Sequence, residues 1–229
     1  MKTPQTVTIT PRQPDDPEPE LIGITLAHRA MLTDVGRLVV AVTAIAEGRQ
    51  RCSARRAQSI ARYTDLLCES IHHHHTVEDT VLWPVINACA AGIVDLTELT
   101  EDHAALDPRL EIIGHRANAF RIAGGDRRTA ALLAAELADL RNLISEHITE
   151  EERELFPVIR RHVSVADWQA VEKTAQRTGR LTFDGPRTVA AATDAERAAL
   201  SKDVSPILRV VLSILARRHR KFENEVFNG

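Results

Sequence analysis

The sequence predicts an all-α fold, an up-down-up-down four-helix bundle followed by a C-terminal helical extension. Apolar residues recur every three or four positions in four long runs, and short segments join these runs. No segment alternates with period two between turn residues for more than a few positions, so strands are not expected. We divide the 229 residues into an arm at 1–20, a bundle at 21–163 and an extension at 164–229.

The N-terminal 20 residues contain five prolines and four acidic residues and little to bury, which predicts a disordered or loosely attached arm. They lack the apolar core of a secretory signal. The longest apolar stretch, residues 38–46, is about half of the ~20 residues that cross a bilayer, so no membrane is expected. Three cysteines without a CxxC pair indicate a cytoplasmic location. A net charge of −3 argues against nucleic acid as a partner.

Each of the four runs in the bundle carries a histidine at a position where an apolar core residue is expected. The first run closes at Gly48, the second is expected to break at Pro84, and the third stops at Gly124–Gly125. The fourth is expected to end near Pro157. The apolar periodicity spans Leu21–Val42, Ile60–Leu82, Leu96–Ile113 and Leu133–Val158.

The extension shows helical patterns interrupted by one long loop. Ser164 is expected to cap a short helix. Residues 180–193 are expected to form a loop with a turn at Asp184–Pro186, and this loop is placed to cover the site described below. Two further helices are expected to begin at Thr193 and Pro206.

A thirteen-residue segment occurs twice in the chain. HHTVEDTVLWPVI at 74–86 and HITEEERELFPVI at 147–159 share seven identical positions. Each begins with a histidine that is followed four residues later by a glutamate. A lone core histidine lies 46 residues before the first segment and 44 residues before the second. The bundle is therefore predicted to contain two copies of one helical hairpin, each offering one lone histidine and one HxxxE pair.

The hairpin turns predict that these histidines and glutamates lie at one level of the bundle. Residues four apart on a helix share a face, about 6 Å apart along the axis. The midpoint between the first two histidines is position 51, and that between the last two is position 125, both inside expected turns. Folding at these turns brings six side chains into one layer: His28, His74, Glu78, His103, His147 and Glu151.

This layer predicts a metal site. Four imidazoles and two carboxylates buried without a nearby lysine or arginine are costly unless a cation satisfies them. Two metal ions bridged by the two glutamates satisfy all six groups. The mixed nitrogen and oxygen ligands suit iron, manganese or zinc, and two redox-capable metals with open positions suit oxygen chemistry.

The pattern H…HxxxE…H…HxxxE, with LWP or LFP after each pair, resembles the hemerythrin-like (HHE) family over residues 21–163. The resemblance implies a non-haem centre of two iron ions with an oxo or hydroxo bridge, with Mn or Zn less favoured. It also implies that the glutamates bridge the irons and that the histidines are terminal ligands. Oxygen-carrying hemerythrins have HxxxH on the third helix, whereas here Asp107 follows His103. Their last carboxylate also lies five residues after its histidine, not four. These departures count against reversible oxygen carriage.

Several neighbouring residues leave alternatives open. Asp107 is a candidate additional ligand or outer-sphere partner, and His75 is an alternative to His74 because it lies three residues before Glu78. Three further histidines lie outside the layer and are expected at the surface: His115, His162 and His219.

The resemblance implies a reaction with O2, hydrogen peroxide or nitric oxide, in a catalase- or peroxidase-like turnover that defends against oxidative or nitrosative stress. The alternative is a non-catalytic sensor of O2, NO or iron that signals through the extension. Metal storage or a structural metal is a third interpretation. A ferritin-like site would need two ExxH helices, and the sequence has just Glu69–His72. The reductant and any protein partner stay open.

Overall fold

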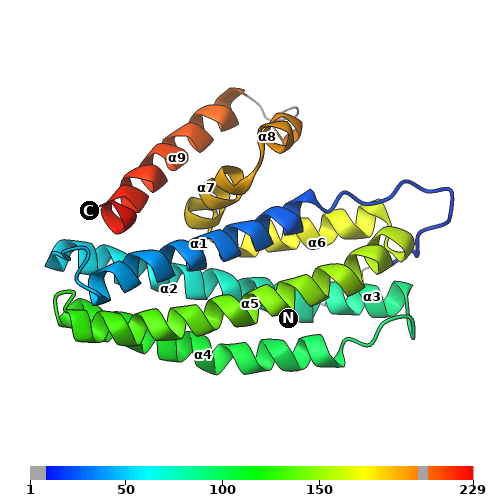
Figure 1. Ribbon diagram of the computed structural model, residues 1–229. Helices are drawn as coiled ribbons and strands as arrows, with labels where there is room; N and C mark the ends of the chain where they lie inside the picture. The colour runs from blue at the N-terminus through cyan, green and yellow to red at the C-terminus, as the bar shows by residue number, and fades with distance from the viewer. Residues whose placement is uncertain (1–8, 201–205, 229) are drawn as a thin grey trace, which may run out of the picture.

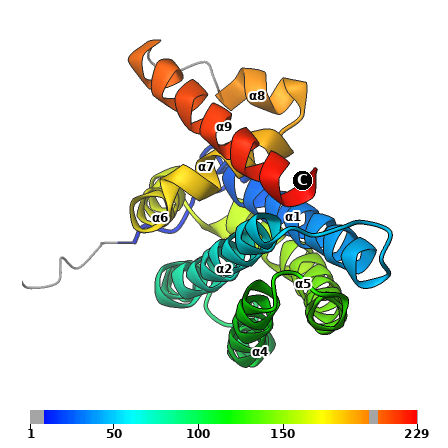
Figure 2. The same ribbon diagram turned by 90° about the vertical axis from the view of Figure 1, so that its left-hand side faces the viewer.

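The computed structural model describes residues 9–200 and 206–228, and all regular structure in these ranges is helical. Figure 2 shows four long helices around a common core, with the α1–α2 and α4–α5 hairpins side by side. The most extensive packing joins the two hairpins, because α1 lies along α5 and α2 lies along α4. These helices are α1 (Ile22–Ala46), α2 (Ala54–Val77), α4 (Thr97–Ile122) and α5 (Arg127–His162). The predicted all-α bundle is confirmed.

The hairpin turns lie where the glycines predicted them. Gly125 adopts a φ of +84°, which favours a residue without a side chain, and a Cβ there would lie 2.6 Å from Cys52 Sγ. The following Asp126 carboxylate accepts hydrogen bonds from the backbone of Arg128 and Thr129 and caps α5. The two turns at this end of the bundle therefore pack directly against each other.

The predicted breaks at the two prolines are wrong. After α2 the chain continues through a π-helical turn (Glu78–Leu82) into α3 (Trp83–Cys89), and Pro157 lies inside α5. In the π turn the Trp83 N–H donates to the Glu78 carbonyl, five residues back. A proline removes one helical hydrogen bond, and the buried Trp83 and Phe156 beside the two prolines hold both helices to the core.

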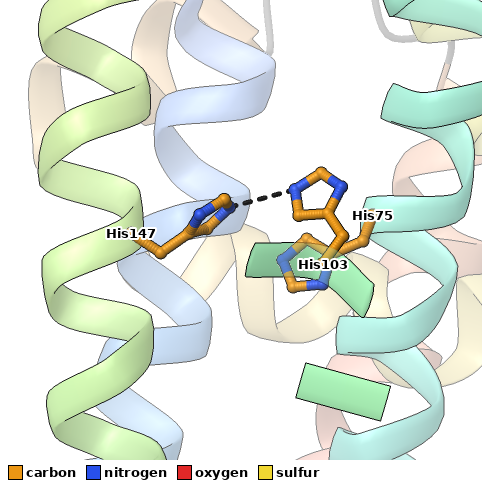
Figure 3. Close-up of side chains that lie close together, drawn as sticks. All are labelled: His75, His103 and His147. Carbon is orange, nitrogen blue, oxygen red and sulfur yellow. Dashed lines mark hydrogen bonds between the residues drawn. The ribbon is translucent and has the colours of Figure 1, made fainter. Parts of the chain in front are cut away.

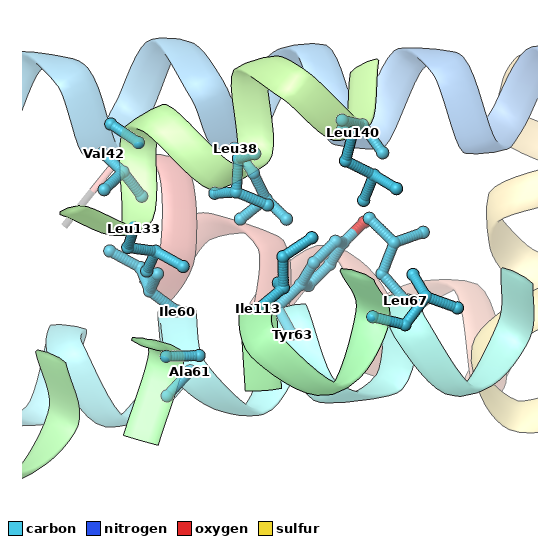
Figure 4. Packing of buried hydrophobic residues seen from close by; sticks show 14 of the residues in the cluster. Leu38, Val42, Ile60, Ala61, Tyr63, Leu67, Ile113, Leu133 and Leu140 are labelled. Carbon is cyan, nitrogen blue, oxygen red and sulfur yellow. The ribbon is translucent and has the colours of Figure 1, made fainter. Parts of the chain in front are cut away.

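The apolar core consists of two clusters that lie toward opposite ends of the bundle. Figure 4 shows the larger cluster, in which leucine, isoleucine and valine side chains from all four long helices surround Tyr63. The smaller cluster gathers around Trp83 and Trp168. The histidine and glutamate layer lies between the two clusters along the chain direction of each helix, so apolar packing closes it from both ends.

The arm at 1–20 is only partly described, because residues 1–8 lie outside the described ranges. Residues 9–20 form no helix. The Thr10 N–H donates to the Asp167 carboxylate at 3.2 Å, and the Arg12 N–H donates to the His162 carbonyl at 2.9 Å. Within the described part, the arm is thus bonded to the end of α5 and the start of α6.

The extension folds onto one side of the bundle as further helices (Figure 1). The long loop predicted at 180–193 is wrong, because Leu181–Ala191 forms α7 through Gly185 and Pro186. The Asp184 carboxylate accepts from the Arg180 N–H at 2.9 Å, and the buried Phe183 packs on Tyr63, which together stabilise this helix. The remaining elements are α6 (Val165–Thr178), α8 (Asp194–Leu200) and α9 (Pro206–Phe227).

Buried polar contacts attach the extension to the bundle. Arg187 of α7 donates to the Asp34 carboxylate of α1 at 2.5 Å, and both side chains are about 95% buried. His219 of α9, expected at the surface, is instead buried between Tyr63 and Phe183. Its position on the face of α9 that meets α2 and α7 explains the difference. None of the described helices combines the length and the hydrophobicity that crossing a bilayer requires.

Candidate metal centre

All six predicted layer residues lie together in the bundle, with His75 as a seventh. They form two adjacent clusters, in each of which one potential ligand atom per residue lies within 4.8 Å of the others. One cluster contains His28, His74, Glu78 and Glu151, and the other contains His75, His103 and His147. Figure 3 shows the three imidazoles of the second cluster converging from α2, α4 and α5.

The two glutamates lie between the clusters. Glu78 directs Oε1 to the His74 Nε2 at 2.9 Å and Oε2 to the His103 Nε2 at 3.7 Å, so its two oxygens face different clusters. Glu151 Oε2 lies 3.4 Å from the His28 Nε2 and 3.9 Å from the His147 Nε2. Each carboxylate therefore contacts both groups of histidines.

The donor atoms fit a pair of metal ions. His28 and His74 bring their Nε2 atoms to 3.0 Å of each other, and His103 and His147 bring theirs to 3.1 Å. Two ligand atoms at right angles around one ion, each about 2.1 Å from it, are separated by about this distance. Apart from the contacts within the layer itself, none of the four carboxylate oxygens of Glu78 and Glu151 has a hydrogen-bond partner among the described residues, although both side chains are buried. Buried carboxylates without other partners need a cation to offset the cost of their burial.

A second layer of carboxylates orients the histidines. The His28 Nδ1 lies 2.8 Å from Glu152 Oε1, and the His103 Nδ1 lies 2.8 Å from Asp79 Oδ1. The His147 Nδ1 lies 3.4 Å from Asp102 Oδ2. A hydrogen bond from Nδ1 to a carboxylate fixes the tautomer that leaves Nε2 free to bind a metal.

Comparison with known protein families identifies the family to which the chain belongs. The hemerythrin HHE cation-binding domain matches residues 23–159, which is most of the bundle and more than half of the chain. The chain belongs to this hemerythrin family. Neither the curated proteins nor the solved structures compared with the chain gave a match.

In this hemerythrin-family chain the two residues left open by the sequence lie in different places. His75 is 4% exposed, stacks on His103 with ring centroids 4.2 Å apart, and belongs to the second cluster. It stands beside His74 in the layer and does not replace it. Asp107 lies at the surface, where its Oδ1 is 2.7 Å from the His72 Nδ1, and it contacts neither cluster.

Burial determines the charge of the hemerythrin-type site. It lowers the pKa of His74 to about 3 and, together with the charge of His103, lowers the pKa of His147 to about 4. It raises the pKa of Glu78 and Glu151 well above the usual range, and for Glu151 the neighbouring Glu78 carboxylate acts in the same direction. The imidazoles of His74 and His147 are therefore neutral at neutral pH, which is the form that can bind a metal ion.

Sequence reasoning missed the outer carboxylates Asp79 and Glu152, although the repeat contained a signal for them. Each follows the inward-facing glutamate of its HxxxE pair, so an acidic residue occupies this position in both copies. One residue further along a helix is a rotation of about 100°. The first acid of each pair therefore enters the layer, and the second reaches the outer edge of a histidine on a neighbouring helix.

Proposed function

We propose that the seven clustered residues bind two metal ions, with Glu78 and Glu151 as bridges. The observation that carries this proposal is that Glu78 and Glu151 each contact histidines of both clusters while their oxygens lack other partners. Three histidines would serve one ion and two the other. His75 supplies the fifth imidazole, which would take the place of the histidine that the third helix lacks.

We propose iron as the metal, with manganese or zinc less favoured. Two redox-capable ions with five imidazoles and two carboxylates would supply electron transfer to a bound O2, hydrogen peroxide or nitric oxide molecule. The role proposed for the protein is defence against oxidative or nitrosative stress by catalase- or peroxidase-like turnover, and the cytoplasm is the compartment proposed.

The residues of the chain support such turnover through orientation and exclusion of water. The outer carboxylates Glu152 and Asp79 hold His28 and His103 in the metal-binding tautomer. Apolar clusters close the layer from both ends, so a reactive ligand is kept from bulk water. Glu78 and Glu151, with raised pKa values, are the groups able to hold a proton at the site when a cation is absent.

A specific contact also favours the second candidate function, a sensor that signals through the extension. Arg187 of α7 bonds to Asp34 of α1, and the same helix lines a cavity whose wall includes His74. A change at His74 therefore has a short path to α7 and, through the packing of α7 on α9, to the end of the chain.

Metal analysis of the purified chain tests the proposal. We expect about two iron ions per chain and charge-transfer absorption bands, and zinc or no bound metal would refute the iron assignment. Glu78→Gln should lose at least one ion, because the side chain keeps its size and loses its negative charge. His115→Ala is the matched control, since His115 is exposed and lies outside both clusters. Gas evolution after addition of peroxide then separates turnover from sensing.

A further inference from the structure

A cavity of about 410 Å³ lies between the bundle and the extension. Its wall on the bundle side comes from α1, α2 and the π turn, and its opposite wall comes from α6 and α7. Figure 2 shows these two helices on the α1–α2 side of the bundle. The volume lies within the range of about 300–1,000 Å³ that is typical of small-molecule sites, and is far larger than O2, NO or peroxide requires.

The cavity reaches the candidate metal centre. His74 and Glu78 form part of its wall. The His74 side chain is 16% exposed, whereas the other six clustered side chains are at most 4% exposed. Among the seven residues, His74 is therefore the point where the layer opens to its surroundings, and it opens into this cavity.

The wall of the cavity is mostly apolar and includes no lysine among the described residues; its uncharged polar side chains include Ser70, Gln176 and Thr188, and it also includes the imidazole of His73. Arg187, the one arginine in the wall, is neutralised by Asp34 at 2.5 Å and Asp184 at 3.1 Å. Glu172 of α6 is half-buried, and burial raises the pKa of its carboxyl group. The larger apolar side chains of the wall include Leu26, Met31, Val77, Leu82, Trp168 and Val171.

This lining selects one class of molecule. A ligand anion would find no lysine or unpaired arginine and would face the carboxylates of Glu172 and Asp184. A ligand cation would have to leave water for a mostly apolar wall. An apolar body is favoured by the surrounding aliphatic and aromatic side chains. A hydroxyl or N–H group on such a molecule has an acceptor in Glu172.

We infer that this cavity binds a small, uncharged, mostly apolar organic molecule with a single hydrogen-bond donor, such as an alcohol, next to the metal centre. Binding in the cavity stands on the lining alone. The placement next to a metal rests on the proposed function. The metal centre would then act on, or respond to, an organic molecule in addition to a diatomic or peroxide ligand.

Calorimetric titration of the metal-free chain with three molecules of equal length tests the class of ligand. We expect 1-octanol to bind saturably and octanoate to bind at least tenfold more weakly, because the anion would face two carboxylates and no lysine or unpaired arginine. Tighter binding of octanoate or of octylammonium than of 1-octanol would overturn the assignment, as would the absence of saturable 1-octanol binding.

A matched pair of substitutions on α6 tests the location. Ala175 lines the cavity, and Ala170 is exposed on the same helix outside it. Ala175→Leu should weaken 1-octanol binding at least about tenfold, since the new side chain displaces roughly two methylene groups, each contributing a factor of about four. Ala170→Leu should leave it unchanged, and equal binding by the two variants would refute the location. Ala27→Leu, from the α1 wall, is a second cavity-filling variant should Ala175→Leu not fold.

Metal loading separates this inference from the proposed function. In the metal-loaded chain, 1-octanol should shift the absorption bands of the centre, and Ala175→Leu should abolish that shift while the metal content stays the same. A chain that binds 1-octanol and no metal refutes the proposed metal centre alone. A chain that binds two metal ions and no 1-octanol refutes the present inference alone.

Discussion

Removal of Glu152 tests whether the outer carboxylates act on the metal through the histidines. Glu152 Oε1 is 2.8 Å from the His28 Nδ1, and its side chain is 34% exposed. Loss of such an outer partner weakens metal affinity about 10- to 100-fold, which is about 1.4–2.8 kcal/mol at 1.4 kcal/mol per tenfold change. Because solvent reaches one third of this carboxylate, we expect a value near tenfold for Glu152→Ala.

The assay is competition for the metal with a chelator of known affinity. Glu150 is the matched control, because it is two residues away and bonds only to the surface residue Arg153 among the described contacts. Glu150→Ala should leave both metal affinities unchanged. Asp79→Ala should lower the metal affinity of the cluster that contains His103 by a similar factor, since Asp79 contacts His103 at the same distance. Equal metal affinities in Glu152→Ala and Glu150→Ala would refute the reasoning.

Three further predictions concern pH, the extension and a turn. In the metal-free chain, burial raises the pKa of Glu78 and Glu151, so their protonated forms are favoured in the folded state. Their contribution to the free energy of unfolding is complete below about pH 4.5 and is lost as the pH rises. The melting temperature of the double glutamine variant should therefore exceed that of the native chain increasingly with pH, and a constant difference would contradict this. Arg187→Leu should lower the free energy of unfolding by about 3–5 kcal/mol in denaturant titrations. The double variant with Asp34→Leu should recover much of the lost free energy of unfolding. If the effects of the two single substitutions simply add, the two side chains do not form the buried ion pair. Gly125→Ala should destabilise by about 1–3 kcal/mol, since its φ is +84° and its Cβ would collide with a neighbouring turn. An unchanged melting temperature would contradict that expectation.

The bundle was predictable because its signals are periodic and repeated. Apolar spacing indicated each long helix, and the positions of Gly48 and Gly124–Gly125 indicated the turns. Proline gave a false boundary at Pro84 and Pro157, because a local rule cannot weigh one lost hydrogen bond against the buried side chains on either side. The helix α7 was missed for the same reason, since its stability depends on contacts of Phe183 and Arg187 with the bundle.

The inner residues of the candidate site were predictable from the repeat, whereas their exact set was not. Adjacent residues on a helix point about 100° apart, which argued for either His74 or His75. The layer accepts both, because each of the two faces a different cluster. The outer carboxylates depend on which helices are neighbours across the bundle, and that pairing follows from packing between hairpins that are distant in the sequence.

The crossed contacts of the outer carboxylates make the two halves of the bundle interdependent. His28 of the first hairpin is held by Glu152 of the second, and His103 of the second is held by Asp79 of the first. Neither His28 nor His103 has its orienting acid on its own hairpin, whereas His147 finds Asp102 on the same hairpin. Two copies of one such hairpin, meeting about a twofold axis, would reproduce the two crossed contacts. The orientation of His28 and His103 is therefore a property of the pair of hairpins and not of either one.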